Sequence, residues 1–186
     1  MPWIRLSPSV NVAASWLACL SKCMKCGMRT RAHNALRDTL GGLCRDALLA
    51  PQLEAHPFTA AQNLRIDLMF GMSGVMNLVD VAITHPFRES NRSHAASTPG
   101  GAATAYEATK HSTYGKYVRE GFQVLVPFVL DTYGALGATA IETARRIAPL
   151  YGRRLGLSST VASRIVFGRL TTCVVRWMAT IATLSQ

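Results

Sequence analysis

Acidic residues are scarce in this chain of 186 residues, which has 10 Asp and Glu against 20 Lys and Arg. Between residue 143 and the end there are seven arginines and no acidic residue. The formal net charge is +10 and the pI about 10.0. This imbalance favours a polyanionic partner, either nucleic acid or an anionic membrane surface.

Glycine and proline are not in excess, with 14 and 8 residues, and 49% of the residues are hydrophobic. This composition excludes wholesale disorder. The length suits one domain with a real core, or one domain with a small appendage.

The five cysteines do not form an even set, which argues against a fully paired secreted framework and favours a nuclear or cytoplasmic location. The spacing Cys23-x2-Cys26-x6-His33 resembles part of a zinc site, with Cys19 or Cys44 as a fourth ligand. The alternative is a set of buried thiols beside an irregular N-terminal segment.

No segment is a firm transmembrane candidate. The apolar run over residues 160–184 contains three arginines, Arg164, Arg169 and Arg176, whose insertion into a bilayer would cost several kcal/mol. An amphipathic helix is the better interpretation, and no membrane is expected as a partner. A basic protein bound to a membrane surface, or a structural protein, is the third and weakest functional alternative.

Hydrophobic periodicity and turn residues predict an α/β fold, with a small mixed sheet flanked by helices and an extra C-terminal helix. Its expected helices cover residues 32–50, 104–120, 138–150 and 160–184. Its expected strands cover residues 64–70, 75–84 and 122–130, with a short extended piece at 52–57 and a flexible loop at 91–103. Pro127 places the last strand at an edge or a bulge.

Two aspartates, Asp67 and Asp80, lie in apolar strand-like runs on either side of a glycine-bounded turn. A carboxylate is costly there unless a cation or hydrogen bonds receive it. Two adjacent strands would present both carboxylates side by side, which suits Mg²⁺. Glu54 could add a third ligand, and Lys110, one helical turn before Tyr114, could orient a water or stabilise developing charge. The plainer alternative is edge aspartates and a solvated lysine.

These residues resemble the PD-(D/E)XK nuclease superfamily, and more narrowly the restriction-like endonuclease region of non-LTR retrotransposon polyproteins. Asp67 matches the first motif aspartate and Asp80 the second acid. The usual lysine position two residues later is Ala82, and Lys110 matches the position to which the retrotransposon branch moves that lysine. Two further stretches add to the resemblance: Arg31-Ala32-His33-Asn34 with Arg37-Asp38, and Pro127-Phe128-Val129-Leu130 with Gly134-Ala135-Leu136-Gly137.

The resemblance implies a Mg²⁺-dependent endonuclease that nicks target DNA so that a 3′ end can prime reverse transcription, with an upstream reverse transcriptase if the chain is a fragment. It implies catalytic roles for Asp67, Asp80, Lys110 and, loosely, Glu54, and a zinc knuckle at Cys23, Cys26 and His33. Basic and aromatic residues expected to contact DNA, or RNA, are Arg65, Tyr114, Lys116, Arg145, Arg146, Arg153 and Arg154.

The expected organisation is a tail over residues 1–22, a degenerate knuckle with the first helix over 23–46, and a nuclease-like domain over 47–186. The second functional hypothesis is an inactive retroelement remnant that keeps the fold and binds nucleic acid without cutting it.

Overall fold

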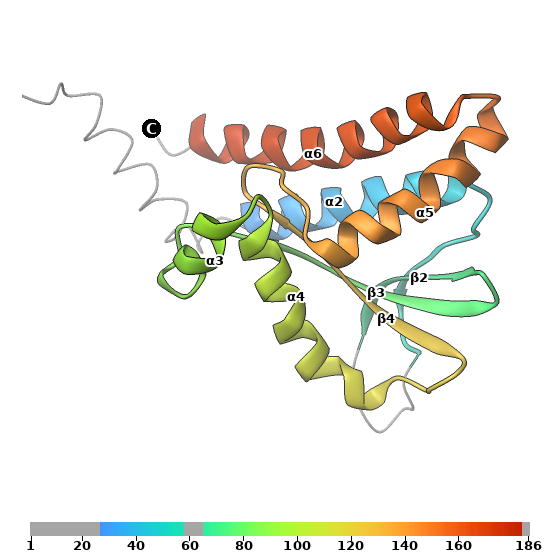
Figure 1. The fold of residues 1–186 in the computed structure, drawn as a ribbon, viewed down its shortest axis with the longest axis horizontal. Helices are drawn as coiled ribbons and strands as arrows, with labels where there is room; N and C mark the ends of the chain where they lie inside the picture. Colours follow the sequence, from blue (N-terminus) through green and yellow to red (C-terminus); the bar gives the residue numbers. More distant parts are fainter. Residues whose placement is uncertain (1–26, 58–64, 184–186) are drawn as a thin grey trace, which may run out of the picture.

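The computed structural model describes residues 27–57 and 65–183, which form a four-stranded mixed sheet between helical layers (Figure 1). The strands are β1 (Gln52–Ala55), β2 (Ile66–Met72), β3 (Val75–Thr84) and β4 (Gln123–Asp131). The helices are α2 (Met28–Asp46), α3 (Arg92–Ser97), α4 (Gly101–Tyr114), α5 (Ala138–Leu155) and α6 (Ser159–Thr183), with short 3-10 turns at Glu89–Asn91 and Gly115–Tyr117. The α/β fold class and the C-terminal helix are therefore confirmed.

The sheet has the order β1-β2-β3-β4, with antiparallel pairs up to β3 and a parallel pair between β3 and β4. A two-residue turn joins β2 to β3, and both of its residues, Ser73 and Gly74, have positive φ (56° and 79°). Such turns match the twist of the strands that they join. β4 lies at the edge of the sheet, as Pro127 predicts, and α4 provides the crossover that a parallel pair requires.

The main core lies between one face of the sheet and the helices α2, α5 and α6. Leu36, Leu40 and Leu43 on α2 are fully buried, at the three- and four-residue spacing of one helix face. They pack in one cluster with strand residues such as Phe70 and Phe128. Helix α2 therefore shares its core with the sheet and with the two C-terminal helices.

The opposite face of the sheet is covered by α4, which Figure 1 shows on the side away from α5 and α6. Ala103 on α4 packs with Ala82 and Val129 of the sheet, and Tyr106 covers this cluster. Tyr114 packs against a second cluster that contains Leu78. This placement brings the middle of α4 over the strand that carries Asp80.

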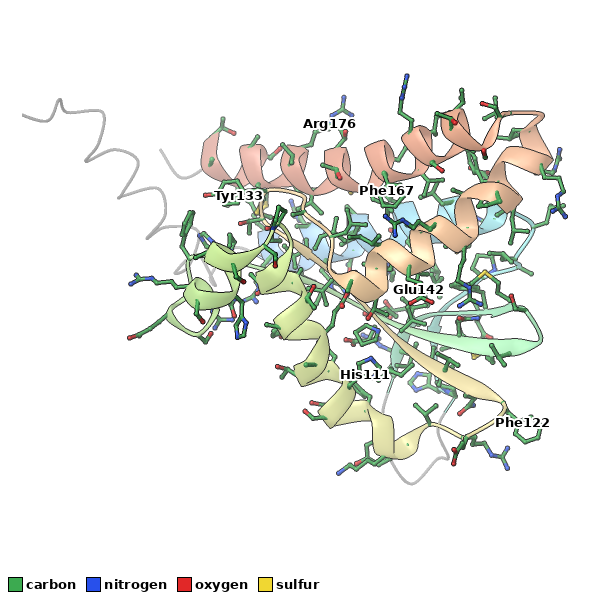
Figure 2. All side chains as sticks on the ribbon, in the orientation of Figure 1. His111, Phe122, Tyr133, Glu142, Phe167 and Arg176 are labelled. Carbon is green, nitrogen blue, oxygen red and sulfur yellow. The ribbon has the colours of Figure 1, made fainter. Side chains whose placement is uncertain are left out.

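Several local expectations were wrong, including two helix bounds: α2 covers Met28–Asp46 instead of 32–50, and α5 continues to Leu155 instead of ending at 150. Residues 91–103, expected to be a loop, contain α3 and the first turn of α4. The helix expected to reach residue 120 ends at Tyr114. The strand expected to start at Phe122 begins at Gln123, and the Phe122 side chain is 76% exposed. Figure 2 shows it beyond the start of β4.

Helix α6 is long and apolar enough, by length and composition, to qualify as a candidate membrane span, the one such helix in the described ranges. It packs through one stripe, whose buried members are Ala162, Val166, Leu170, Val174 and Ile181. Arg176 lies away from that stripe and projects outward from α6 (Figure 2). This one-sided burial is the pattern of an amphipathic helix.

Candidate active site

The candidate site lies where β2 and β3 separate. Their ladder ends at the pair Leu68–Val79, while β3 continues to Thr84. One residue beyond that pair, Asp67 and Asp80 occupy facing positions. The backbone N–H of Val81 donates to Asp67 Oδ2 at 2.8 Å, so a side chain takes over where the strand pairing stops. The ladder and this hydrogen bond together fix both aspartates at the same level of the sheet.

Both aspartates line one pocket of about 370 Å³ between α2, α4 and the sheet. Burial at this position is substantial, with side-chain exposures of 14% for Asp67 and 8% for Asp80. The other lining residues are Arg29, His33, Arg65, Val81, Ala82, Ile83, Tyr106, Lys110 and Tyr114. Two carboxylates, several cations and two tyrosines thus converge in one hollow.

Lys110 reaches this pocket from α4, and its Nζ lies 2.8 Å from Asp80 Oδ2. Tyr106 and Tyr114, four residues before and after it, follow the same helix face, and each ring centroid is 5.7 Å from the ammonium. Contacts of this kind favour a cation over a neutral amine. The helix therefore presents Lys110 as a cation held between two rings and aimed at Asp80.

The protonation of the three charged residues follows from burial and pairing. Burial by itself would raise the pKa of Asp67, but the hydrogen bond and charge of His33 and the Val81 amide hold it below its ordinary value. Burial raises the pKa of Asp80, the Asp67 charge adds to this, and Lys110 opposes it. Burial would lower the pKa of Lys110, but Asp80 raises it overall, so the amine stays protonated. Lys110 is therefore suited to stabilise negative charge and unsuited to accept a proton.

Helix α2 supplies the other wall of the pocket. His33 Nε2 lies 3.1 Å from Asp67 Oδ1, and Arg29, one turn earlier, also lines the pocket. Arg37, one turn later, binds Glu54. These three residues recur every fourth position, which places them along one helix face. From the sequence we did not predict that these three residues line up beside Asp67 and Glu54, although their four-residue spacing on a helix indicated a shared face.

Glu54 does not line the pocket. Its carboxylate is held by Arg37 on one side and by Arg65 on the other, with Arg65 Nε 2.6 Å from Glu54 Oε2. Its backbone has a φ of +53°, which is unusual for a residue other than glycine. The structure therefore places Glu54 behind Arg65, where it orients that pocket-lining cation.

Asp67 and Asp80 are the lining residues that could hold a divalent cation, with water as its other ligands. Asp80 Oδ2 is buried and lies 2.8 Å from Lys110 Nζ, so the ammonium already occupies one side of this oxygen and a cation would use the remaining lone pairs of the two carboxylates. Among the lining residues the two carboxylates stand against three cations, Arg29, Arg65 and Lys110, so a hard cation would depend on direct contact with the carboxylate oxygens and not on a net negative pocket. Over residues 27–57 and 65–183, no group of three or more His, Cys, Asp or Glu residues is arranged to hold a metal. A cation here would rely on Asp67, Asp80 and water.

Of the expected zinc ligands, only His33 and the alternative ligand Cys44 lie among the described residues. Cys23 and Cys26, with the alternative ligand Cys19, lie outside the described residues. His33 faces Asp67 in the pocket. Cys44 is fully buried in the core, and burial raises the pKa of its thiol to about 12. A protonated core thiol is a poor zinc ligand.

Of the expected DNA-contacting residues, Arg65 and Tyr114 lie at the pocket. Lys116 is exposed just beyond α4, with its Nζ 5.0 Å from the centroid of the Tyr117 ring. The remaining four do not line the pocket and belong to α5, which packs on the other face of the sheet: Arg145, Arg146, Arg153 and Arg154.

A buried carboxylate ties the lysine-bearing helix to the main body of the fold. Glu107, only 3% exposed, accepts hydrogen bonds from the backbone N–H groups of Thr139 (2.9 Å) and Ala140 (3.1 Å) in the first turn of α5. It thereby satisfies donors that a helix start leaves unpaired. A side chain at Gly137 would collide with the Glu107 carboxylate. Because Glu107 lies one turn before Lys110, this clamp sets the position of Lys110.

No protein-family model matches the chain, and a search of curated proteins finds no relative.

Proposed function

We propose that the chain is a metal-dependent endonuclease domain that nicks DNA by hydrolysing a phosphodiester bond, as expected for a retroelement nuclease. The observation that supports this most is the placement of Lys110, 2.8 Å from Asp80 in the pocket that Asp67 also lines. A buried carboxylate pair beside a fixed cation, in a chain of net charge +10, suits an anionic substrate and a hard divalent metal.

Each residue has a distinct task in this proposal. Asp67 and Asp80 would hold Mg²⁺, with Asp67 oriented by His33 and the Val81 amide. When bound, the ion lowers the pKa of a coordinated water and offsets charge on the phosphate. Lys110 stays protonated and stabilises the charge that grows on the phosphate oxygens. Arg29 and Arg65 lie at the pocket to hold the neighbouring phosphates.

In the reaction, the oxygen of a water forms a bond to phosphorus while the P–O3′ bond breaks. The attacking water releases one proton to the surrounding solvent and the leaving O3′ takes one up, so the products are a 3′ hydroxyl and a 5′ phosphate. The 3′ hydroxyl is the end that a reverse transcriptase could extend.

The test is nicking of supercoiled plasmid by the purified full chain in Mg²⁺, with EDTA as the negative condition. Asp67→Asn, Asp80→Asn and Lys110→Met should each lower the nicking rate by about 10²-fold or more. Glu142→Gln, which changes an exposed acid on α5, is the matched control and should nick at the wild-type rate. Equal nicking by wild type and Asp67→Asn would show that the site is wrong.

The inactive remnant predicts a different result. Its pocket would keep the Lys110–Asp80 pair, and the protein would bind DNA in a salt-sensitive way. No nicking would appear with Mg²⁺ or Mn²⁺ in the wild type. Such a result, with intact folding, would replace the nuclease proposal by a binding function.

A further inference from the structure

The hairpin formed by α5 and α6 carries a concentration of arginines away from the pocket. Five arginines lie between residues 145 and 164, and we call them the hairpin arginines: Arg145, Arg146, Arg153, Arg154 and Arg164. All but Arg146 are exposed, and Arg146 is half-buried with Nη2 3.3 Å from Ser73 Oγ. Across the described ranges, none of the five forms an ion pair with an acidic side chain.

The packing of the hairpin gathers these side chains. Gly152 on α5 approaches α6 so closely that a Cβ there would lie 2.8 Å from the Cβ of Ala162. This contact sets the last turn of α5, with Arg153 and Arg154, beside the first turns of α6, which carry Arg164. Arg146 and Arg153, seven residues apart, follow one side of α5. The hairpin thus carries Arg146 and Arg153 along one side of α5, with Arg154 and Arg164 near the turn that joins the two helices.

Acidic residues do not offset these arginines. Glu142 is the one acid on α5, and the sequence has none from residue 143 to residue 186. Elsewhere some basic residues have an acidic neighbour in the chain, as with Arg88 and Glu89 or Arg119 and Glu120. All seven basic residues after Glu142 are arginines, whose planar fork suits bidentate contacts to phosphate.

The hairpin surface lies on the opposite side of the sheet from the lysine-bearing helix. Ala144 and Ile147 of α5 pack in the core shared with α2 and α6, whereas Tyr106 and Tyr114 of α4 pack against the other face. Figure 1 shows α5 and α6 on one side of the strands and α4 on the other. A nucleic-acid segment held on the hairpin is therefore not the segment whose phosphate enters the pocket.

We infer that the hairpin arginines form a second, non-catalytic surface that binds the backbone of a nucleic-acid duplex independently of sequence. This inference concerns binding and holds whether or not the pocket cuts. The surface anchors the protein on nucleic acid while the pocket works on a separate stretch. Phosphate contacts of this kind give affinity that falls steeply with salt.

The test measures duplex binding by fluorescence anisotropy from 50 to 200 mM KCl in EDTA, so that no cleavage occurs. Arg153→Ala/Arg154→Ala/Arg164→Ala changes three exposed side chains. The control, Arg88→Ala/Arg92→Ala/Arg119→Ala, removes the same charge from exposed positions elsewhere. The hairpin variant should reduce the slope of log K against log salt by about 2 to 3. Between 50 and 200 mM KCl, the wild-type affinity should therefore fall by a factor about 40 times larger than the affinity of the hairpin variant.

Asp67→Asn/Lys110→Met removes one phosphate-facing cation at the pocket and should reduce the slope by about 1 at most, clearly less than the hairpin variant. Equal slopes for the two triple variants would overturn the inference. The exposed Leu155 (47%) and Val161 (42%) of the hairpin make an anionic membrane the competing partner. If phosphatidylserine vesicles bind through the three arginines and the duplex does not, the inference is wrong. Thermal unfolding of each variant confirms that it is folded.

Discussion

Lys110 and Asp80 form an ion pair at 2.8 Å across the gap between α4 and the central strand β3, although thirty residues separate them in the chain. Both side chains are largely buried, with exposures of 19% and 8%. A buried ion pair is seldom the most economical way to stabilise a fold, because both charges lose their hydration. Its position beside a second carboxylate is the feature on which the proposed charge chemistry depends.

Replacing Lys110 by Met should destabilise the fold by about 1–3 kcal/mol, because Asp80 then keeps a buried charge without its partner. The double variant Asp80→Asn/Lys110→Met should recover part of this loss, since neither charge remains. Urea unfolding at pH 7 of the wild type, both single variants and the double variant gives the coupling free energy. Strictly additive effects would mean that the pair does not interact in solution.

Asp67 should make stability depend on pH in the acid range. Its pKa is lower in the folded than in the unfolded protein, so its contribution is fully present above about pH 4 and disappears as the pH falls through the folded value. Urea unfolding between pH 2.5 and 6 should therefore show a smaller acid loss in Asp67→Asn than in the wild type. His33→Gln should reduce the acid loss as well, because His33 lowers the pKa of Asp67. Parallel curves for all three proteins would contradict this assignment.

Local sequence signals were sufficient for the strands around the site. The strand Val75–Thr84 and the turn before it were predictable because β-branched residues and a glycine-bounded turn act over a few residues. The Lys110–Asp80 and His33–Asp67 contacts could not be predicted from the sequence, because local patterns do not show which helix packs next to which strand. The resemblance to a nuclease pointed to Lys110, whereas His33 was expected to be a zinc ligand.

The segment over 91–103 shows why composition misled. Its Ser, Ala, Gly and Thr residues are typical of a loop, yet Ala102 and Ala103 are buried, and Ala103 packs against the sheet. Gly100, with φ +76°, lies so close to the carbonyl oxygen of Leu136 that a side chain would collide with it. Small residues were needed there for close packing, a tertiary cause that the local pattern does not display.

Glu107→Ala should destabilise the protein by about 2–3 kcal/mol, because two buried N–H groups at the start of α5 lose their acceptor. Glu107→Gln keeps an acceptor oxygen and should cost about half as much. Glu142→Ala changes an exposed residue on α5 and should stay within about 0.5 kcal/mol of wild type. Chemical denaturation measures the free energy of unfolding of all three variants. If Glu107→Ala lowers it no more than Glu142→Ala does, Glu107 does not hold α4 to α5.

Cys44 should resist thiol reagents in the native protein, because its side chain is fully buried and its pKa is raised to about 12. Cys173 is partly exposed and should react at pH 8. Mass spectrometry after a short iodoacetamide pulse distinguishes the two sites. If Cys44 reacts as fast as Cys173, or becomes reactive only when a zinc chelator is added, the core placement is wrong and a zinc site regains support.

Asp67 and Asp80 are proposed to share one divalent cation in the pocket. Electron paramagnetic resonance of free Mn²⁺, titrated with protein in the absence of DNA, measures this without relying on cleavage. The wild type and Glu142→Gln should each bind Mn²⁺ at one saturable site. Asp67→Asn and Asp80→Asn should each bind it at least tenfold more weakly. Mn²⁺ binding that is undetectable in the wild type, or unchanged in both aspartate variants, would contradict this proposal.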